Sequence, residues 1–443
     1  MIIVHFKKKS TLFIKFIFIN FFKLNNLDLK LDKKGGQRYE VERKFGISTL
    51  CTRVGLQMIY FDNAASQKIR KEALETLNKG LKNCFANPSA KHKFGQSLLK
   101  KIEDHRNYFT KTVKGKDLYD FVFTSSATES NNMALLSFDF KEGDVAYISS
   151  SEHPSLIGPL KECEKRGLVI KELPLDESGI LDQETFFQNL DSKVILVALS
   201  HVNNQSGVIQ PVEEFSQRLK KIKEETKIHV DATQSFSKLS ISLFDQYIDY
   251  MTVSSHKLGG PKGIAGIYVK KGVSIKPLLY GGGQEKNLRS STQSFPLISS
   301  FTRAVKEGMD SLEGEYNRVD NIYKKIRTTL KENIPEVLFP FSSSDKCKVS
   351  PYILTFVVPN ISSDIILRHM EQEEIYLSST SACSSKVKGE NTVFKGLGID
   401  NKYHKNVLRI SFSNETTWEE GKIFCEKLKN CIDEMSFLMP KKK

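Results

Sequence analysis

The sequence lacks the cysteine patterns that indicate a disulfide scaffold or a zinc site. Its seven cysteines are odd in number and widely spaced over 443 residues, with no Cys-x-x-Cys and no Cys/His cluster at zinc-ligand spacing. A chain of this length, 39% hydrophobic, buries large cores without covalent crosslinks. We therefore expect a protein of a reducing compartment, with two or three domains by length.

The sequence also lacks a hydrophobic run long enough to span a bilayer. The apolar stretch at residues 11–22, TLFIKFIFINFF, is interrupted by Lys15 and Asn20, and no small-residue cleavage site follows it. A basic organelle presequence is one reading of residues 1–57, and a translation start at Met58 is another. We expect an extension that is disordered or absent from the mature protein, no membrane span, and a cytoplasmic location, with organelle targeting as the alternative.

The positive charge is not distributed like a nucleic-acid interface. The formal net charge is +14, but residues 1–57 alone hold twelve Lys/Arg against four Asp/Glu, a surplus of eight. No zinc-finger, basic-zipper or ribonucleoprotein signature accompanies this surplus. The sequence therefore predicts no stable nucleic-acid partner.

Short strand-like runs alternate with amphipathic segments between residues 73 and 310. The runs lie at 119–125, 144–150, 193–200, 227–232 and 249–255, and 212–225 is a representative helix pattern. This alternation predicts an α/β domain with a mainly parallel sheet covered by helices, in which ligands bind at the carboxyl ends of the strands. After a helical stretch at 299–333, residues 351–358, 363–373, 408–413 and 417–436 predict a smaller α+β domain. We expect the large domain to span 73–310 and the small one 58–72 with 311–443.

Polar residues at the predicted strand ends are candidates for chemistry. Lys257, within SSHKLGGPKG, suits Schiff-base chemistry, although a solvated loop lysine has the same pattern. Ala127 and Thr128 open a helix after a strand, where they can hold an anion or simply cap the helix. Asp231 ends an apolar strand and calls for a cationic partner such as a protonated pyridine nitrogen. His153 can stack on an aromatic ring, or serve as a capping or core histidine. Together these features describe a pyridoxal 5'-phosphate site.

The ordered motifs of residues 58–430 resemble the cysteine desulfurases, pyridoxal phosphate enzymes of the class V aminotransferase family, in the long-catalytic-loop branch of iron–sulfur cluster assembly. The motifs are YFDNAAS (60–66), NPSAKHKFG (87–95), TSSATESNN (124–132), SEHPS (151–155), HVNNQSG (201–207), HVDATQS (229–235), SSHKLGGPKG (254–263), GGGQEKNLRSST (281–292) and SSTSACSS (378–385). The resemblance implies the fold-type I aminotransferase architecture.

The resemblance also implies a role for each site residue. Lys257 would bind the cofactor as a Schiff base and move protons, Asp231 would keep the pyridine nitrogen protonated, and His153 would stack on the ring. A guanidinium suits the substrate carboxylate because it donates two parallel hydrogen bonds. The other roles are phosphate and ring-oxygen binding by Ala127, Thr128, Gln234, Ser254 and His256; ring and substrate contact by Asn204; substrate carboxylate binding by Asn87 and Arg409; and contact with the partner subunit's cofactor by Thr292, which implies a homodimer.

Cys383, a thiol in a serine-rich loop, is either incidental or the residue that takes sulfur from L-cysteine as a persulfide and leaves L-alanine. The resemblance implies the second reading, with an iron–sulfur scaffold or another acceptor protein as partner, and tRNA thiolation as a further destination. No resident metal is expected, although Cys383 could transiently ligate a cluster on a scaffold. Gln205 stands where the family usually has Glu, and Thr380, Ser291 and Ser413 where it has Gly. The alternatives are a selenocysteine lyase or an aminotransferase.

Overall fold

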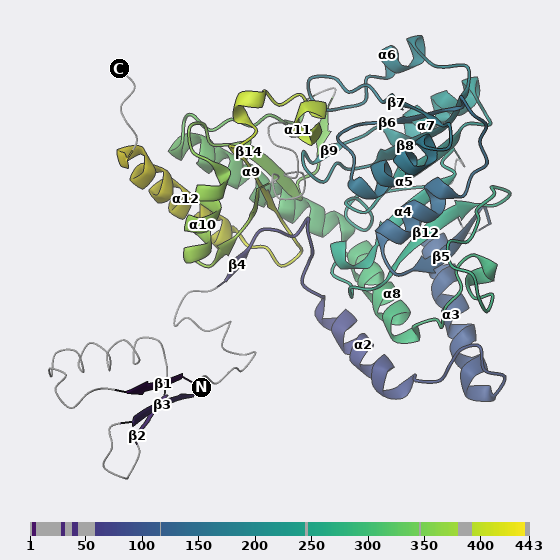
Figure 1. The fold of residues 1–443 in the computed structure, drawn as a ribbon, viewed down its shortest axis with the longest axis horizontal. Coiled ribbons are helices and arrows are strands. Elements are labelled where there is room, and N and C mark those ends of the chain that lie inside the picture. The colour runs from purple at the N-terminus through teal and green to yellow at the C-terminus, as the bar shows by residue number, and fades with distance from the viewer. Residues whose placement is uncertain are drawn as a thin grey trace. The chain divides into compact units, whose positions relative to one another are not determined.

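The structure is a computed structural model that describes residues 2–5, 28–31, 38–42, 58–115, 117–243, 247–344, 347–379 and 392–438. The chain divides into two units, residues 1–57 and 58–443, each described by itself. In the first unit, β1 (Ile2–His5), β3 (Arg38–Glu42) and β2 (Asp28–Leu31) form an antiparallel sheet in that order (Figure 1). These strands were not predicted. That the mature protein lacks this unit stays a prediction.

A seven-stranded sheet forms the centre of the second unit. Its strands, in spatial order, are β5 (Tyr119–Thr124), β12 (Ala265–Lys270), β11 (Tyr250–Ser254), β10 (Lys227–Asp231), β8 (Val194–Ser200), β6 (Val145–Ile148) and β7 (Val169–Glu172). Only β12 runs against its neighbours, so the sheet is mainly parallel as predicted. The predicted α/β class is confirmed.

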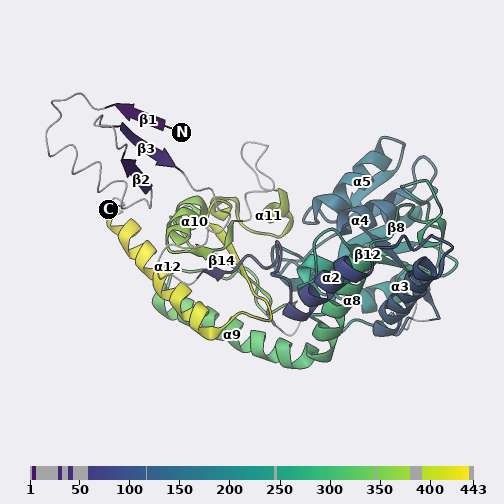
Figure 2. The ribbon, with the colours of Figure 1, turned by 90° about the horizontal axis from the view of Figure 1, so that it is seen from below.

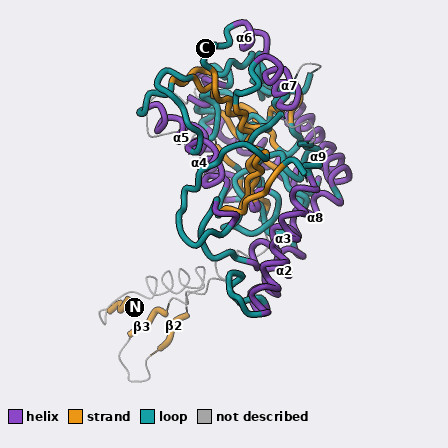
Figure 3. The backbone as a smooth tube through the Cα atoms, turned by 90° about the vertical axis from the view of Figure 1, so that its right-hand side faces the viewer, coloured by secondary structure: helices purple, strands orange, loops and turns teal. Residues whose placement is uncertain are grey.

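Alternating side chains of the strands enter two different cores, one on each face of the sheet. Phe121 and Phe123 pack with apolar residues of three helices, α3 (Lys93–Thr112), α7 (Val212–Ile222) and α8 (Phe295–Asp310). Val122 faces the opposite way, toward α4 (Ala127–Leu136) and α5 (Pro154–Glu164). Figure 3 shows the strands between these two helical layers. Burial on both faces explains why the strands read as near-continuous apolar runs.

A second, smaller group of elements surrounds an antiparallel sheet. This sheet has the order β14 (Ile353–Val357), β17 (Val407–Ser411), β16 (Ser378–Ser379). Beside it, β4 (Ile59–Tyr60) pairs in parallel with β15 (Ile375–Tyr376). The helices α9 (Leu312–Asn333), α10 (Ser363–Gln372) and α12 (Trp418–Leu438) share its apolar core. The boundaries predicted for a small domain stay a prediction, because residues 58–443 form a single unit.

The shorter elements complete the fold. They are α2 (Lys71–Asn83), α6 (Gln183–Gln188), α11 (Thr392–Gly396), β9 (Val208–Ile209) paired with β13 (Lys348–Val349), and the 3-10 turns η2 (Ser255–Lys257), η3 (Glu285–Asn287) and η5 (Asn401–Tyr403). The helical stretch predicted at 299–333 is two helices that meet at Ser311. Figure 2 shows that α9 extends from the end of α8 and lies beside α12. Each helix among the described residues is too short or too polar to cross a bilayer.

Candidate active site

A cavity of about 560 Å³ lies at the carboxyl edge of the large sheet. The segments that follow β5, β6, β8, β10 and β11 all contribute to its wall. Asp62, Ala65, Ser378 and Arg409 close it from the smaller group of elements. In a mainly parallel sheet, this edge is where ligands are expected to bind.

Most of the predicted site residues line this one cavity. They are Ala127, Thr128, His153, Asn204, Asp231, Gln234, Ser254, His256, Lys257 and Arg409. Asn87 and Thr292 are exposed and lie outside its lining. Cys383, like Thr380, lies outside the described residues. The roles of all these residues stay predictions.

Lys257 ends the turn η2 directly after β11, and its side chain is half-buried. Its Nζ donates to the carbonyl oxygens of Ala64 at 2.7 Å and Ala65 at 2.8 Å. These carbonyls belong to the turn after β4, so the amine connects the large sheet to the segment that begins at Met58. A solvated loop lysine would not be held in this way.

Asp231, at the end of β10, brings a buried carboxylate to the cavity, with only 6% of the residue exposed. Its Oδ2 accepts from Asn131 Nδ2 at 2.8 Å and its Oδ1 from the Thr233 amide at 2.9 Å. Both donors are neutral, and no described cationic side chain pairs with it at salt-bridge distance. A buried carboxylate without an ionic partner favours a cation inside the cavity.

The N-terminus of α4 favours an anion in the cavity, in contrast to Asp231, which favours a cation. Ser126 caps this helix by accepting from the Glu129 amide, so the predicted cap by a serine near Thr128 is present. The first N–H groups of a helix, here those of Ala127 and Thr128, have no partner within the helix and attract anions. Gln234 lines the same cavity but does not add to this preference, because its Nε2 donates to the Ala64 carbonyl at 2.9 Å and its Oε1, which has no partner among the described atoms, is an acceptor. The anion site therefore rests on the N–H groups of α4. This end of the cavity suits an anion.

Two histidines line the same cavity in different ways. His153 caps α5, because its Nδ1 accepts from the Ser155 amide at 3.1 Å, so it is both a cap and a cavity residue. His256 lies 3.2 Å from Ser66 Oγ. Burial and the neighbouring Lys257 charge lower the pKa of His256 to about 4, so it is neutral at pH 7.

Arg409, on β17, lies on the other side of the cavity with 5% of the residue exposed. Its Nη2 pairs with Asp62 Oδ1 at 2.8 Å, and its Nη1 donates to the Asn204 carbonyl at 2.8 Å. Gln205 Oε1 lies 3.4 Å from the same Nη1. The Nε of Arg409 is buried without a partner among the described atoms. Its Nη2 carries two N–H donors and makes one hydrogen bond among the described residues, so the guanidinium retains a donor for a ligand carboxylate.

Sequence reasoning missed several groups that form this site. Asp62 and Glu152 lie in motifs that were recognised, but neither was assigned a role. Glu152 is 5% exposed, and its carboxylate accepts hydrogen bonds from the Ser200 amide at 2.9 Å and from the Ser200 hydroxyl. Burial raises the pKa of Glu152 to about 7. The available signal was a carboxylate directly before His153 at a strand end.

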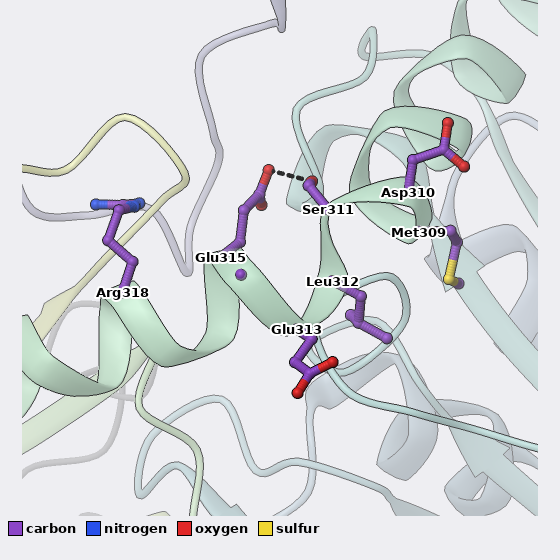
Figure 4. A pocket seen from close by; sticks show the side chains of 8 residues that line it. Met309, Asp310, Ser311, Leu312, Glu313, Glu315 and Arg318 are labelled. Carbon is purple, nitrogen blue, oxygen red and sulfur yellow. Dashed lines mark hydrogen bonds between the residues drawn. The ribbon is translucent and has the colours of Figure 1, made fainter.

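A second hollow, of about 700 Å³, lies where α8 meets α9 (Figure 4). In it Ser311 Oγ donates to Glu315 Oε1 at 2.7 Å, the bond dashed in Figure 4. Glu315 also pairs with Arg70 at 2.9 and 3.0 Å, and Arg70 Nε donates to the Leu258 carbonyl at 3.1 Å. These contacts fix the residue after Lys257 to α9, which gives this hollow a structural explanation.

No cluster of three or more potential metal ligands occurs in the part of the chain that the structure describes. The expected absence of a resident metal stays a prediction.

Comparison with known proteins identifies the family. The aminotransferase class-V model matches residues 59–424. The protein named cysteine desulfurase IscS 1 of Archaeoglobus fulgidus is 30% identical over 86% of this chain and 99% of its own length. A NifS/IcsS protein homolog of Lactobacillus delbrueckii is 33% identical over 83% and 95%. A protein of Trachipleistophora hominis named cysteine desulfurase, mitosomal, is 29% identical over 86% and 88%.

Solved structures agree with this assignment. A NifS-like protein superposes with a TM-score of 0.78 at 28% identity, over 85% of this chain and all of that one. A structure titled SspA in complex with cysteine superposes with a TM-score of 0.67 at 28% identity, over 81% of this chain and all of that one. The resemblance read from the sequence is therefore confirmed. The chain belongs to the class-V aminotransferase family.

Proposed function

We propose that the protein is a cysteine desulfurase that converts L-cysteine to L-alanine and transfers the sulfur to Cys383 as a persulfide. The observation that carries this proposal is the single cavity that brings together Lys257, Asp231 and Arg409. An amine, a buried carboxylate and a guanidinium are the groups needed to hold an aromatic aldehyde cofactor beside an amino acid. The names of the matched relatives support the same activity.

The residues of the cavity fit pyridoxal 5'-phosphate. The buried Asp231 carboxylate, which lacks an ionic partner among the described residues, suits a protonated pyridine nitrogen. The N-terminus of α4, with Thr128, Gln234, Ser254 and His256 nearby, would hold the phosphate and ring oxygen. When bound, this cofactor supplies an electron sink that weakens bonds to the substrate carbons.

The chain's own residues supply binding, proton transfer and the sulfur acceptor. Arg409, with Asn204 beside it and Asn87 as a further candidate, binds the substrate carboxylate. Lys257 carries a proton to and from the substrate at Nζ, and His153 packs on the ring. The Cys383 thiolate attacks the substrate sulfur, so that the carbon–sulfur bond breaks and a sulfur–sulfur bond forms. The substrate carbon takes up a proton, and alanine and the Cys383 persulfide are the products.

The test is alanine release from L-cysteine by the purified, pyridoxal phosphate-loaded protein, with Cys383→Ser and Lys257→Ala beside it. We expect alanine and, with a thiol reductant, sulfide from the wild type, and neither from the variants. Turnover by Cys383→Ser at the wild-type rate would replace this proposal with a lyase, which expels the sulfur without a protein thiol. Formation of 3-mercaptopyruvate instead of alanine, with the sulfur retained and the amino group passed to a keto acid, would indicate an aminotransferase.

The proposed partners are a second copy of this chain and a sulfur-acceptor protein. The segment that carries Thr292 is exposed and joined to the Asn87 segment by a contact of 3.4 Å between Gln284 Nε2 and Ser89 Oγ. Tyr280 precedes the Thr292 segment and Phe85 precedes Asn87, and they are 83% and 78% exposed. Large apolar side chains exposed on a single subunit are typical of a surface that a second subunit covers. The persulfide supplies iron–sulfur cluster assembly, tRNA thiolation, or both.

We place the protein in the cytoplasm, with an organelle reached through residues 1–57 as the alternative. A relative named mitosomal supports the alternative. Because residues 58–443 form a unit of their own, deletion of 1–57 separates targeting from catalysis. Fluorescent fusions with and without residues 1–57 decide between the locations, and unchanged alanine release after the deletion is expected.

A further inference from the structure

Behind the cavity wall, a chain of hydrogen bonds starts at His229 and ends at His153. His229 Nε2 lies 2.9 Å from Asn131 Oδ1. Asn131 Nδ2 lies 2.8 Å from Asp231 Oδ2 and 2.9 Å from Ser155 Oγ. Ser155 Oγ lies 2.8 Å from His153 Nδ1. Asn131 and His229 are fully buried, whereas Asp231 and His153 line the cavity.

The direction of each hydrogen bond follows from the Asp231 carboxylate. An ionised carboxylate only accepts, so the NH₂ group of Asn131 must face it, and the amide oxygen must face His229. His229 therefore donates from Nε2 and carries its proton there. Its Nδ1 has no partner among the described atoms. Burial lowers the pKa of His229 to about 4, so the ring is neutral at pH 7.

The second branch fixes the proton of His153. The Ser155 hydroxyl oxygen accepts from Asn131, and its own hydrogen is then available for His153 Nδ1. The Ser155 amide donates to the same Nδ1 at 3.1 Å. With two donors directed at Nδ1, this nitrogen is an acceptor. The proton of neutral His153 therefore lies on Nε2.

These contacts would satisfy the polar groups of any buried cluster, but they do more in this position. Asn131 gives Asp231 a neutral donor, so the carboxylate is held in place while its charge remains uncompensated. The same amide, through one hydroxyl, decides which ring nitrogen of His153 is protonated. Asn131, which lies outside the cavity lining, thus fixes the position of the Asp231 carboxylate and the protonated nitrogen of His153.

We propose that Asn131 is a positioning residue of the site: it orients the Asp231 carboxylate and, through Ser155, keeps the His153 proton on Nε2. This inference rests on the proposed function, since a protonated pyridine nitrogen is the cation that Asp231 would meet. His229 acts as the anchor that prevents the Asn131 amide from turning over. The two branches separate at Asn131, which makes them individually testable.

The test compares Asn131→Ala and Ser155→Ala with Asn132→Ala as the matched control. Asn132 is the next residue on α4, and among the described residues its Nδ2 donates to the Thr128 carbonyl of the same helix alone. The first measurement is nitrogen-15 NMR of protein labelled at histidine, with and without pyridoxal phosphate, the His153 signals being assigned with His153→Gln. The second is the dissociation constant of pyridoxal phosphate, from its absorbance.

We expect wild-type His153 to carry its proton on Nε2, and both Asn131→Ala and Ser155→Ala to mix the two tautomers. Asn131→Ala should also weaken pyridoxal phosphate binding at least tenfold, whereas Ser155→Ala, which leaves the contact between Asn131 and Asp231, should weaken it less than threefold. Asn132→Ala should match the wild type in both measurements.

A wild-type proton on His153 Nδ1, or an Asn131→Ala protein that matches Asn132→Ala in tautomer and affinity, would overturn the proposal. If Asn131→Ala does not fold, Asn131→Leu, which has nearly the same shape and lacks the two N–H donors, takes its place with the same expectations. If the wild type binds no pyridoxal phosphate, the proposed function fails. The tautomer of His153 in the cofactor-free protein still decides the hydrogen-bond directions.

Discussion

The guanidinium of Arg409 lies between a carboxylate and a neutral amide, and this arrangement controls how strongly it attracts a substrate. Asp62 pairs with its Nη2 at 2.8 Å, while Gln205 approaches Nη1 at 3.4 Å. A charge-assisted bond to a second carboxylate would be about twice as strong as the present neutral contact. A carboxylate at position 205 would therefore compete with the substrate for Arg409, whereas the neutral Gln205 does so weakly.

Gln205→Glu should raise the KM for L-cysteine about tenfold with little change in kcat. The added carboxylate repels the substrate carboxylate and occupies the guanidinium, while the reacting atoms are untouched; a tenfold change is about 1.4 kcal/mol. Steady-state alanine release checks this. The double variant Gln205→Glu/Asp62→Asn restores one carboxylate at Arg409 and should recover most of the lost affinity. An unchanged KM in the single variant would contradict the prediction.

Glu152 should make stability depend on pH. Because burial raises its pKa from 4.5 to about 7, the folded protein holds a proton that the unfolded chain loses between these values. Stability from this group is fully present below pH 4.5 and declines as the pH rises toward 7. Gln at position 152 does not titrate. The melting temperature of Glu152→Gln minus that of the wild type should therefore increase as the pH is raised from 5 to 7.5. A gap independent of pH, as expected for the exposed Glu142→Gln, would refute this.

At the scale of elements, the break between α8 and α9 is stabilised by an ion pair rather than by a helix cap. Glu315 on α9 pairs with Arg70, the residue before α2, and the side chains are 17% and 9% exposed. Arg70 in turn holds the Leu258 carbonyl, one residue after Lys257. The Arg70 guanidinium therefore joins the start of α2, the segment after Lys257 and α9 beside the site.

Glu315→Gln should lower the free energy of unfolding by about 2 kcal/mol, because it leaves the Arg70 charge largely buried without its partner. Glu415→Gln is the matched control. Its pair with Lys68 is exposed, at 50% and 77%, so the loss should stay below about 0.5 kcal/mol. Equilibrium urea unfolding of the two variants measures the difference. Equal losses would mean that burial does not strengthen the Arg70 pair.

The sequence predicted those elements whose residues carry their own pattern. The strands β5, β6, β8, β10, β11, β14 and β17 and the helices at 363–372 and 418–438 match the prediction to within a few residues, whereas β7 and β12 were not predicted. The strand β12 was missed because AGIYVK follows directly on the glycine-rich lysine motif, and its reversed direction depends on neighbours far along the chain. The break at Ser311 was missed because the apolar spacing continues through it.

The candidate site follows the same division. The strand-end residues from Ala127 to Lys257 could be brought together by reasoning, because parallel strands end at one edge. The contacts of Asn131 with His229 and of Asp62 with Arg409 could not. They join residues 98 and 347 positions apart, and neither residue type is unusual where it stands.

For the whole molecule, the homodimer proposal makes a prediction about mixed subunits. Lys257→Ala removes an amine from its own cavity, whereas Thr292→Val should impair the cavity of the partner subunit. A dimer with one copy of each variant would have one site with both defects and one with neither.

Coexpression of Lys257→Ala and Thr292→Val, followed by isolation of the mixed dimer through two different tags, should restore alanine release to about half of the wild type. Lys257→Ala paired with itself should stay inactive. If Thr292→Val alone has wild-type activity, or if the mixed dimer reaches no more than half the activity of the Thr292→Val dimer, Thr292 does not act across the interface.

The contact between Asp62 and Arg409 also has a consequence for how the protein is made. Asp62 and Arg409, two of the residues that close the cavity, are 347 positions apart, so the ribosome must translate most of the chain before they can meet. At roughly 5–20 residues per second, this interval lasts roughly 20–70 s. During biosynthesis the strand ends and Lys257 are therefore exposed until Arg409 has been made. In this interval a free cofactor aldehyde is able to react with the growing chain before the site is complete.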